Sequence, residues 1–72
     1  MDRAIIVDHL ELARRHVSEG QGQVARQREL VREMARDGHS TAEARKVLQT
    51  FEDTLASFKA DRDRLIKKLR GL

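Results

Sequence analysis

Residues 34–44 read Met-Ala-Arg-Asp-Gly-His-Ser-Thr-Ala-Glu-Ala, and they contain the one clear break in a chain that is otherwise patterned for long helices. Gly38 suits the left-handed backbone position that follows many helix ends. Ser40 followed by Glu43 predicts a capping box at the start of the next helix, and Thr41 is an alternative N-cap. The segment therefore predicts a turn between two helices.

On each side of this turn, mostly apolar and small residues recur at alternating spacings of four and three. These spacings place them in one stripe along a helix, and their persistence is typical of coiled-coil packing. Two polar residues, Gln27 and Arg62, fall inside the stripes. A buried polar residue can fix the register, whereas an Arg near the open end can extend to water. The first stripe is Ile6, Leu10, Ala13, Val17, Gly20, Val24, Gln27, Val31 and Met34, and the second is Ala44, Leu48, Phe51, Leu55, Phe58, Arg62, Leu65, Leu69 and Leu72.

Folding the chain at Gly38 brings the two stripes face to face in mirrored order. We therefore expect an all-α fold, an antiparallel two-helix hairpin of the coiled-coil type, forming one domain over residues 1–72. The expected elements are a helix at about 3–37, a turn at 38–40 and a helix at about 41–70. The expected pairs include Met34 with Ala44, Gly20 with Phe58, Ile6 with Leu72, Arg28 with Glu52, His16 with Asp61 and His9 with Lys68.

Two glycines, Gly20 and Gly22, lie within the first predicted helix, where each costs roughly 1 kcal/mol relative to Ala. They could mark a kink or a second break that gives three shorter helices. We favour a continuous helix, because the stripe passes through both positions without a change of phase. Gly20 has a packing explanation, since it leaves room for the ring of Phe58, whereas Gly22 lies away from the seam and has none.

Composition excludes several classes of protein. The chain has no Cys, so disulfides, thiolate metal sites and a cysteine nucleophile are absent, and its lack of Pro favours long helices. The short apolar run at residues 4–7 is broken by Asp8, so it is not a secretion signal, and nothing approaches the roughly 20 apolar residues that span a bilayer. We expect a cytoplasmic protein that does not contact a membrane.

A lone hairpin leaves each apolar stripe incompletely covered, and stable helical domains usually pack three or four helices together. We therefore predict a homodimer in which two hairpins form a four-helix bundle, and a function in protein–protein interaction or as a structural module. The alternative is a hairpin that completes its core on a different protein. The predicted interface is a strip of apolar and small residues along one flank: Ile5, Leu12, Leu30, Val47, Thr50, Thr54 and Ser57.

The sequence offers little for catalysis, and we expect neither an enzyme nor a cofactor. His9 and His16 share one helix face, but the Glu-x-x-His pairs of di-metal bundles are absent, so no metal site is predicted. A phosphorelay role for His16 beside Asp61 is a third hypothesis. Against a phosphorelay, the stretch His9-Leu10-Glu11-Leu12-Ala13-Arg14 lacks the proline that follows the histidine of sensor kinases and the Lys-Gly-Ser stretch of phosphotransfer domains. The favoured interpretation is that His16 and Asp61 form a surface pair.

Nucleic-acid binding is the alternative function, because the excess positive charge lies in the second half of the chain. Acidic residues are interleaved with the cations, and no aromatic residue outside the seam is available for stacking on bases, so this function is not favoured. The candidate contacts are Arg62, Arg64, Lys67, Lys68 and Arg70.

Three segments carry a family resemblance: residues 25–29 (Ala-Arg-Gln-Arg-Glu), residues 36–44 (Arg-Asp-Gly-His-Ser-Thr-Ala-Glu-Ala) and residues 48–52 (Leu-Gln-Thr-Phe-Glu). Together they resemble a group of short uncharacterised bacterial proteins that share an Asp-Gly-His turn followed by a Thr-Ala-Glu-Ala helix. The resemblance covers nearly the whole chain and implies a stand-alone bacterial helical hairpin. It implies no activity, and the matching residues are turn and seam residues.

Overall fold

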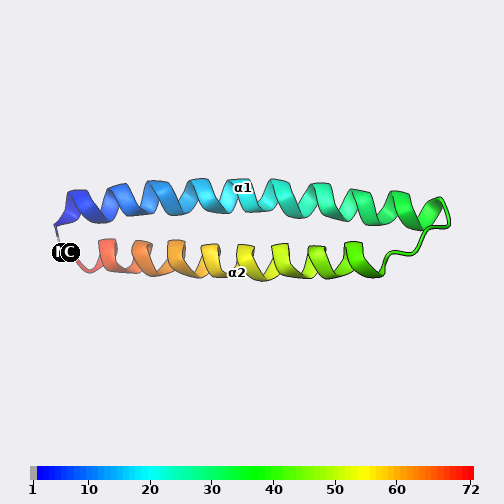
Figure 1. Cartoon of the computed structure of the whole chain (residues 1–72). Helices are drawn as coiled ribbons and strands as arrows, with labels where there is room; N and C mark the ends of the chain where they lie inside the picture. The colour runs from blue at the N-terminus through cyan, green and yellow to red at the C-terminus, as the bar shows by residue number, and fades with distance from the viewer. Residues whose placement is uncertain (1) are drawn as a thin grey trace.

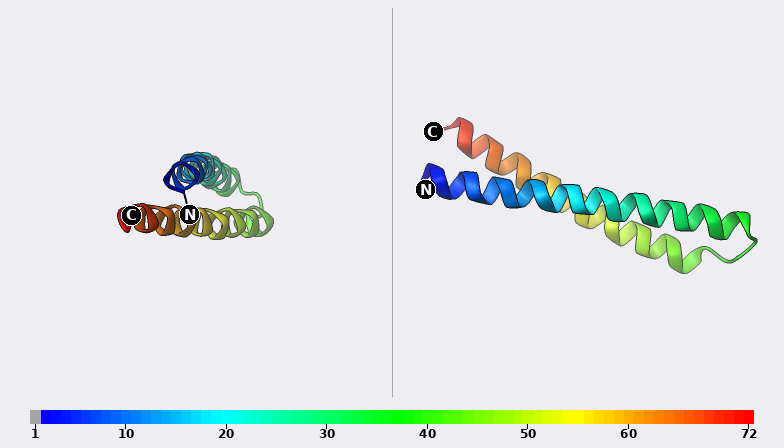
Figure 2. Two further views of the ribbon diagram at one scale, coloured as in Figure 1. Left: turned by 90° about the vertical axis from the view of Figure 1, so that its left-hand side faces the viewer. Right: turned by 90° about the horizontal axis from the view of Figure 1, so that it is seen from above.

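The computed structural model describes residues 2–72, which form two helices, α1 (Arg3–Arg36) and α2 (Ala42–Arg70), and no strand. The helices run antiparallel beside each other, so the start of α1 and the end of α2 lie at the same end of the hairpin (Figure 1). We call this the open end and the opposite one the turn end. The hairpin measures 54 × 14 × 13 Å, and the two helices cross when seen from above (Figure 2). The prediction of an all-α chain with two helices is confirmed.

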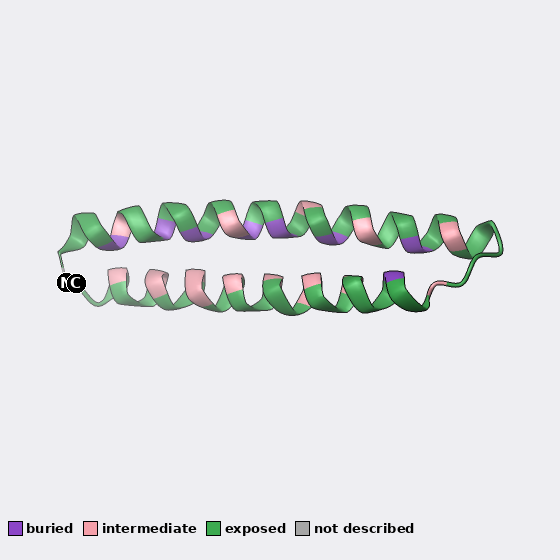
Figure 3. Cartoon of the chain, in the orientation of Figure 1, coloured by how far each residue is buried: buried purple, intermediate pink, exposed green. Residues whose placement is uncertain are grey.

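The core is a single seam between the helices, and its two sides are buried to different degrees (Figure 3). In α2 only Ala44 is buried, and the larger stripe residues from Leu48 to Leu69 are half-buried. The physical reason is size: the stripe of α1 is rich in small side chains, which large side chains from α2 cover completely while keeping their own outer surfaces exposed. The buried residues of α1 are Ile6, Leu10, Ala13, Val17, Gly20, Val24 and Val31.

The structure corrects the expected seam at the open end. Helix α2 ends at Arg70, and Leu72 lies beyond it with 66% of its surface exposed. The expected packing of Leu72 on Ile6 is therefore wrong. That prediction assumed that α2 continues to residue 72, whereas the helix ends two residues earlier. The continuous seam stops at Leu69, which is half-buried.

Helix α1 passes through Gly20 and Gly22 without a break, as predicted. A Cβ atom built on Gly20 would lie 3.1 Å from Leu55 Cδ1 and 3.6 Å from Phe58 Cδ2. The expected contact with Phe58 is present, but Leu55 makes the closer approach. The predicted flank pair is also present, since Arg28 Nη2 lies 3.4 Å from Glu52 Oε1 across the two helices. These contacts fix the register of the hairpin.

The turn after α1 has the hydrogen bonds of a Schellman motif. Gly38 adopts φ +78°, the left-handed conformation predicted for it. The N–H of His39 donates to the carbonyl of Met34 at 2.9 Å, and the N–H of Gly38 donates to the carbonyl of Ala35 at 3.2 Å. Two carbonyls at the end of α1 that would otherwise lack a partner are satisfied in this way.

The predicted capping box of Ser40 and Glu43 is wrong. The N-cap of α2 is Thr41, the alternative, and its side chain makes no capping hydrogen bond. The Thr41 hydroxyl instead accepts a hydrogen bond from Arg45 Nε at 2.9 Å, while Glu43 lies 3.4 Å from Lys46. Because α2 begins one residue later than a Ser40 cap requires, the box cannot form.

Both polar residues of the stripes have partners. Gln27 Nε2 donates to the backbone carbonyl of Ala44 at 3.0 Å, which ties the middle of α1 to the first turn of α2. Arg62, near the open end, directs its guanidinium to Asp63, with Nε 3.0 Å from Oδ1. Gln27 thus supplies a directional contact between the helices, and Arg62 reaches the surface as the alternative interpretation predicted.

Candidate protein interface

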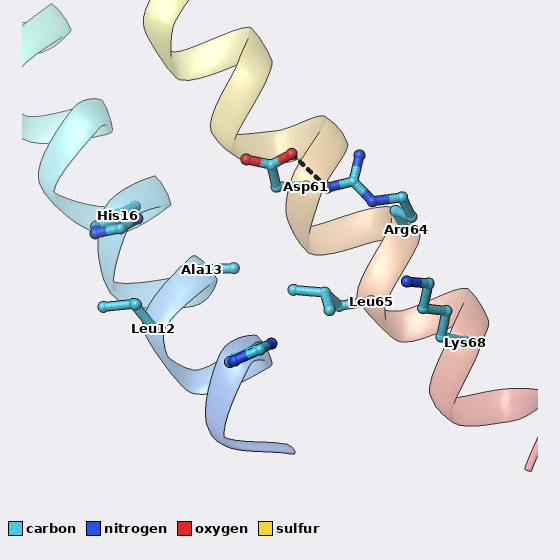
Figure 4. Close-up of a pocket in the computed structure, with 8 residues that line it drawn as sticks. Leu12, Ala13, His16, Asp61, Arg64, Leu65 and Lys68 are labelled. Atoms are coloured by element: carbon cyan, nitrogen blue, oxygen red, sulfur yellow. Dashed lines mark hydrogen bonds and ion pairs between the residues drawn. The ribbon is translucent and has the colours of Figure 1, made fainter. Parts of the chain in front are cut away.

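A pocket of about 310 Å³ opens between the helices near the open end of the hairpin (Figure 4). Its floor is apolar, because Ala13 from α1 and Leu65 from α2 point toward each other (Figure 4). Polar and cationic side chains surround this floor. The complete lining is His9, Leu12, Ala13 and His16 from α1 with Asp61, Arg64, Leu65 and Lys68 from α2.

The charged groups of the pocket are arranged differently from the sequence prediction. Arg64 Nη2 donates to Asp61 Oδ1 at 2.8 Å, so Asp61 pairs with Arg64 and the expected pair with His16 is wrong. A spacing of three residues places Arg64 one helical turn from Asp61, within easy reach of its carboxylate. The ring of His16 instead packs against Phe58, with ring centroids 4.9 Å apart and an angle of 33° between the planes.

His9 and Lys68, from opposite helices, both line this pocket. Within residues 2–72, no three His, Asp or Glu side chains come together in a group that could hold a metal ion. The single carboxylate of the pocket already accepts from Arg64. An apolar floor with an imidazole and ammonium rim suits a short acidic side chain flanked by an apolar one.

The pocket belongs to a longer face that extends to the turn end. Because a spacing of seven residues returns a side chain to nearly the same side of a helix, the residues in register with the pocket lining can be followed along both helices. We call this surface the pocket face. In α1 it comprises Ile5, His9, Leu12, His16, Glu19, Gln23, Arg26, Leu30 and Glu33, and in α2 it comprises Glu43, Val47, Thr50, Thr54, Ser57, Asp61, Arg64 and Lys68.

Most of the large exposed apolar side chains in the described chain lie on the pocket face. Ile5 and Leu12 are each 45% exposed near the open end, and Leu30 and Val47 are each 43% exposed near the turn end. Leu72, at the end of the chain, is the other such residue among residues 2–72. All seven residues of the predicted interface lie on the pocket face and are exposed: Ile5, Leu12, Leu30, Val47, Thr50, Thr54 and Ser57.

The cations predicted to contact nucleic acid are distributed around α2. At 100° per residue, Arg64, Lys67 and Lys68 lie within about 100° of one another around the helix, whereas Arg62 and Arg70 lie outside that arc. Arg62 and Arg64 are already engaged by Asp63 and Asp61. Asp61 and Asp63 interrupt the positive charge of this segment, which weakens the case for contact with a phosphate backbone.

The hairpin exposes more surface than a compact chain of its mass. A folded monomer of 8.3 kDa is expected to expose about 4,600 Å², and this chain exposes 5290 Å². Its radius of gyration is 16.4 Å, against about 11 Å for a compact domain of this length. The excess of roughly 700 Å² is close to the area, about 800 Å², that one partner buries in a standard protein–protein interface.

No family model, curated protein or solved structure matches this chain. No helix within residues 2–72 has the length and apolar character needed to cross a bilayer. The sequence identified an exposed strip along one flank, whose role as an interface stays a prediction, but it missed the pocket and the pairing of Asp61 with Arg64. The three-residue spacing of those two residues was the signal that could have found the pair.

Proposed function

We propose that this chain is a non-enzymatic protein-interaction module that associates with a second copy of itself through the pocket face. The product is a homodimer of two hairpins, a four-helix bundle. The observation that carries the proposal is the placement of Ile5, Leu12, Leu30 and Val47, which are exposed on one common face. Apolar groups gathered on one side of a surface mark a contact site, whereas single scattered ones do not.

Two further observations support a second copy as the occupant. The surface in excess of a compact monomer is of the size that each partner of a standard complex buries. On the α2 side, the centre of the pocket face carries the small side chains of Thr50, Thr54 and Ser57, which leave room for a helix of a second copy. Two hairpins packed in this way would enclose a second apolar layer in addition to the seam that each hairpin already buries.

The direct test is the molar mass in solution, measured by size exclusion with light scattering over a range of protein concentrations. We expect a dimer at micromolar concentration. The variant Leu12→Gln should weaken the dimer. Leu12 is 45% exposed in the hairpin, and its replacement by a polar side chain would remove the apolar contact that it makes with the second copy. Leu72→Gln is the matched control, since Leu72 is also exposed but lies off the pocket face.

A helical species that remains monomeric throughout the micromolar range would refute self-association. The pocket face would then be assigned to a different protein. Equal weakening of the dimer by the Leu12 and Leu72 variants would also count against the proposal, because it would show that association does not use the pocket face.

A further inference from the structure

We propose that the two copies pack antiparallel, so that the acidic turn end of each pocket face covers the pocket at the open end of the other. This inference rests on the proposed self-association and adds its orientation and its charge contacts. It also assigns an occupant to the pocket, namely Glu33 of a second copy. Each pocket is then completed by a residue that its own chain cannot supply.

The charges of the pocket face differ between its two ends. Near the turn end the face carries Glu33 and Glu43, both exposed. Near the open end it carries Lys68 and His9, together with Arg64, whose charge is paired with that of Asp61. Because opposite charges attract and like charges repel, this pattern favours contact between the turn end of one copy and the open end of another.

The apolar residues impose the same orientation. A twofold axis that lies between the two pocket faces at the level of Gln21, perpendicular to the length of the hairpin, places Leu12 of one copy against Leu30 of the other. Val47 reinforces this contact, because it lies at the level of Leu30 on the facing helix. Leu30 and Val47 of one copy, both exposed, then lie against the surface around Leu12 beside the pocket of the other copy.

The same axis gives favourable partners to the charged residues. It places Glu33 at the level of His9, whose neighbour across the pocket is Lys68. It also places Arg26 at the level of His16, on the pocket rim that contains Asp61. One choice of axis therefore satisfies an apolar contact and two charge contacts, and the symmetry repeats each of them.

The parallel arrangement lacks these advantages. With the twofold axis along the hairpin, α1 of one copy would lie over α2 of the other. Lys68 would then lie at the level of Lys68 and His9 of the other copy, and Glu33 at the level of Glu33 and Glu43. The apolar residues of the open end would contact those of the open end of the other copy, and the same holds at the turn end. Hydrophobic contact therefore forms in both arrangements and does not distinguish them. Charge does, because repulsion at both ends opposes the parallel dimer.

Single cysteines test the orientation directly, since the natural chain contains none. Leu12→Cys and Leu30→Cys are prepared separately, mixed, allowed to exchange and oxidised, and the products are identified by mass. The antiparallel dimer predicts disulfides between positions 12 and 30 only. Two copies of position 12 would lie about 27 Å apart along the bundle, given 1.5 Å per residue, far beyond the reach of a disulfide.

Charge reversal tests the contact of Glu33 with Lys68. Lys68→Glu and Glu33→Lys should each weaken the dimer by on the order of tenfold at low salt, because each change affects two symmetry-related contacts. The double variant should recover most of the affinity. Lys67→Glu is the matched control for Lys68→Glu, because it makes the same change one residue away and off the pocket face.

The outcomes separate this inference from the proposed function. A chain that stays monomeric in the light-scattering experiment overturns both. A dimer that forms 12–12 and 30–30 disulfides in place of 12–30, or that forms none of them, overturns the antiparallel arrangement but leaves self-association intact. If the double charge variant is no tighter than the single ones, Glu33 does not contact Lys68.

Discussion

The substitution Gly20→Leu should destabilise the hairpin, although most replacements of a glycine within a helix stabilise it. A Cβ atom at position 20 would already lie 3.1 Å from Leu55 Cδ1 and 3.6 Å from Phe58 Cδ2. The remaining carbons of a Leu side chain would have to displace these two side chains, and overpacking of this kind costs about 1–3 kcal/mol. The gain in helix propensity of up to about 1 kcal/mol partly offsets that cost.

Gly22→Leu is the matched control, because it makes the same replacement in the same helix outside the seam. A Cβ atom there would meet only Arg26 Nη1, at 3.3 Å. That atom is the end of a flexible side chain and can move at little cost. We expect Gly22→Leu to stabilise the hairpin by up to about 1 kcal/mol through helix propensity. This position shows no packing reason for glycine.

The assay is urea denaturation followed by far-UV circular dichroism, with all variants at one protein concentration because association adds to apparent stability. The propensity gain is common to both variants, so their difference in unfolding free energy isolates the overpacking. We expect Gly20→Leu to be less stable than Gly22→Leu by about 1–3 kcal/mol. Equal stability of the two variants would refute the seam, since it would mean that Leu55 and Phe58 do not lie against Gly20.

Three further variants test the turn and the contacts between the helices by the same denaturation. Gly38→Ala should cost about 1–2 kcal/mol, because its φ of +78° is unfavourable for a residue with a Cβ atom, and an unchanged midpoint would argue against the left-handed turn. Gln27→Ala should cost about 0.5–1.5 kcal/mol through its lost hydrogen bond to the carbonyl of Ala44, and no loss would mean that this bond does not form in solution. Glu52→Gln should change stability by less than about 1 kcal/mol, and less at high salt, because its ion pair with Arg28 is exposed; a larger, salt-independent loss would contradict this reasoning.

Much of the fold follows from local patterns in the sequence. The alternating spacing of apolar residues identified both helices, and Gly38 identified the turn, because each depends only on neighbouring residues. The N-cap of α2 was harder to predict, since Ser40 and Thr41 are both suitable capping residues and differ by one position. The failure at Leu72 has a similar cause, because the spacing pattern does not show where a terminal helix ends.

The candidate site could be predicted from the sequence only in part. The exposed strip that includes Leu12 and Leu30 was predicted because helical periodicity alone assigns residues to a face. The pocket was not, because it depends on Ala13 of α1 and Leu65 of α2 meeting across the seam with charged side chains around them. Likewise the sequence pattern paired His16 with Asp61, and only the packed structure shows that His16 contacts Phe58 while Asp61 is held by Arg64.

The sequence by itself determined that this chain forms two long helices joined at Gly38, and which side of each helix is apolar. These properties are set by backbone preferences and by the 3.6-residue repeat, both of which act along the chain. Only the tertiary structure decided that α1 is buried more deeply than α2, that a pocket opens beside Leu12, and which ion pairs form there. Those features depend on the sizes and reach of side chains from two segments that meet in space, and no single stretch of the chain contains that information.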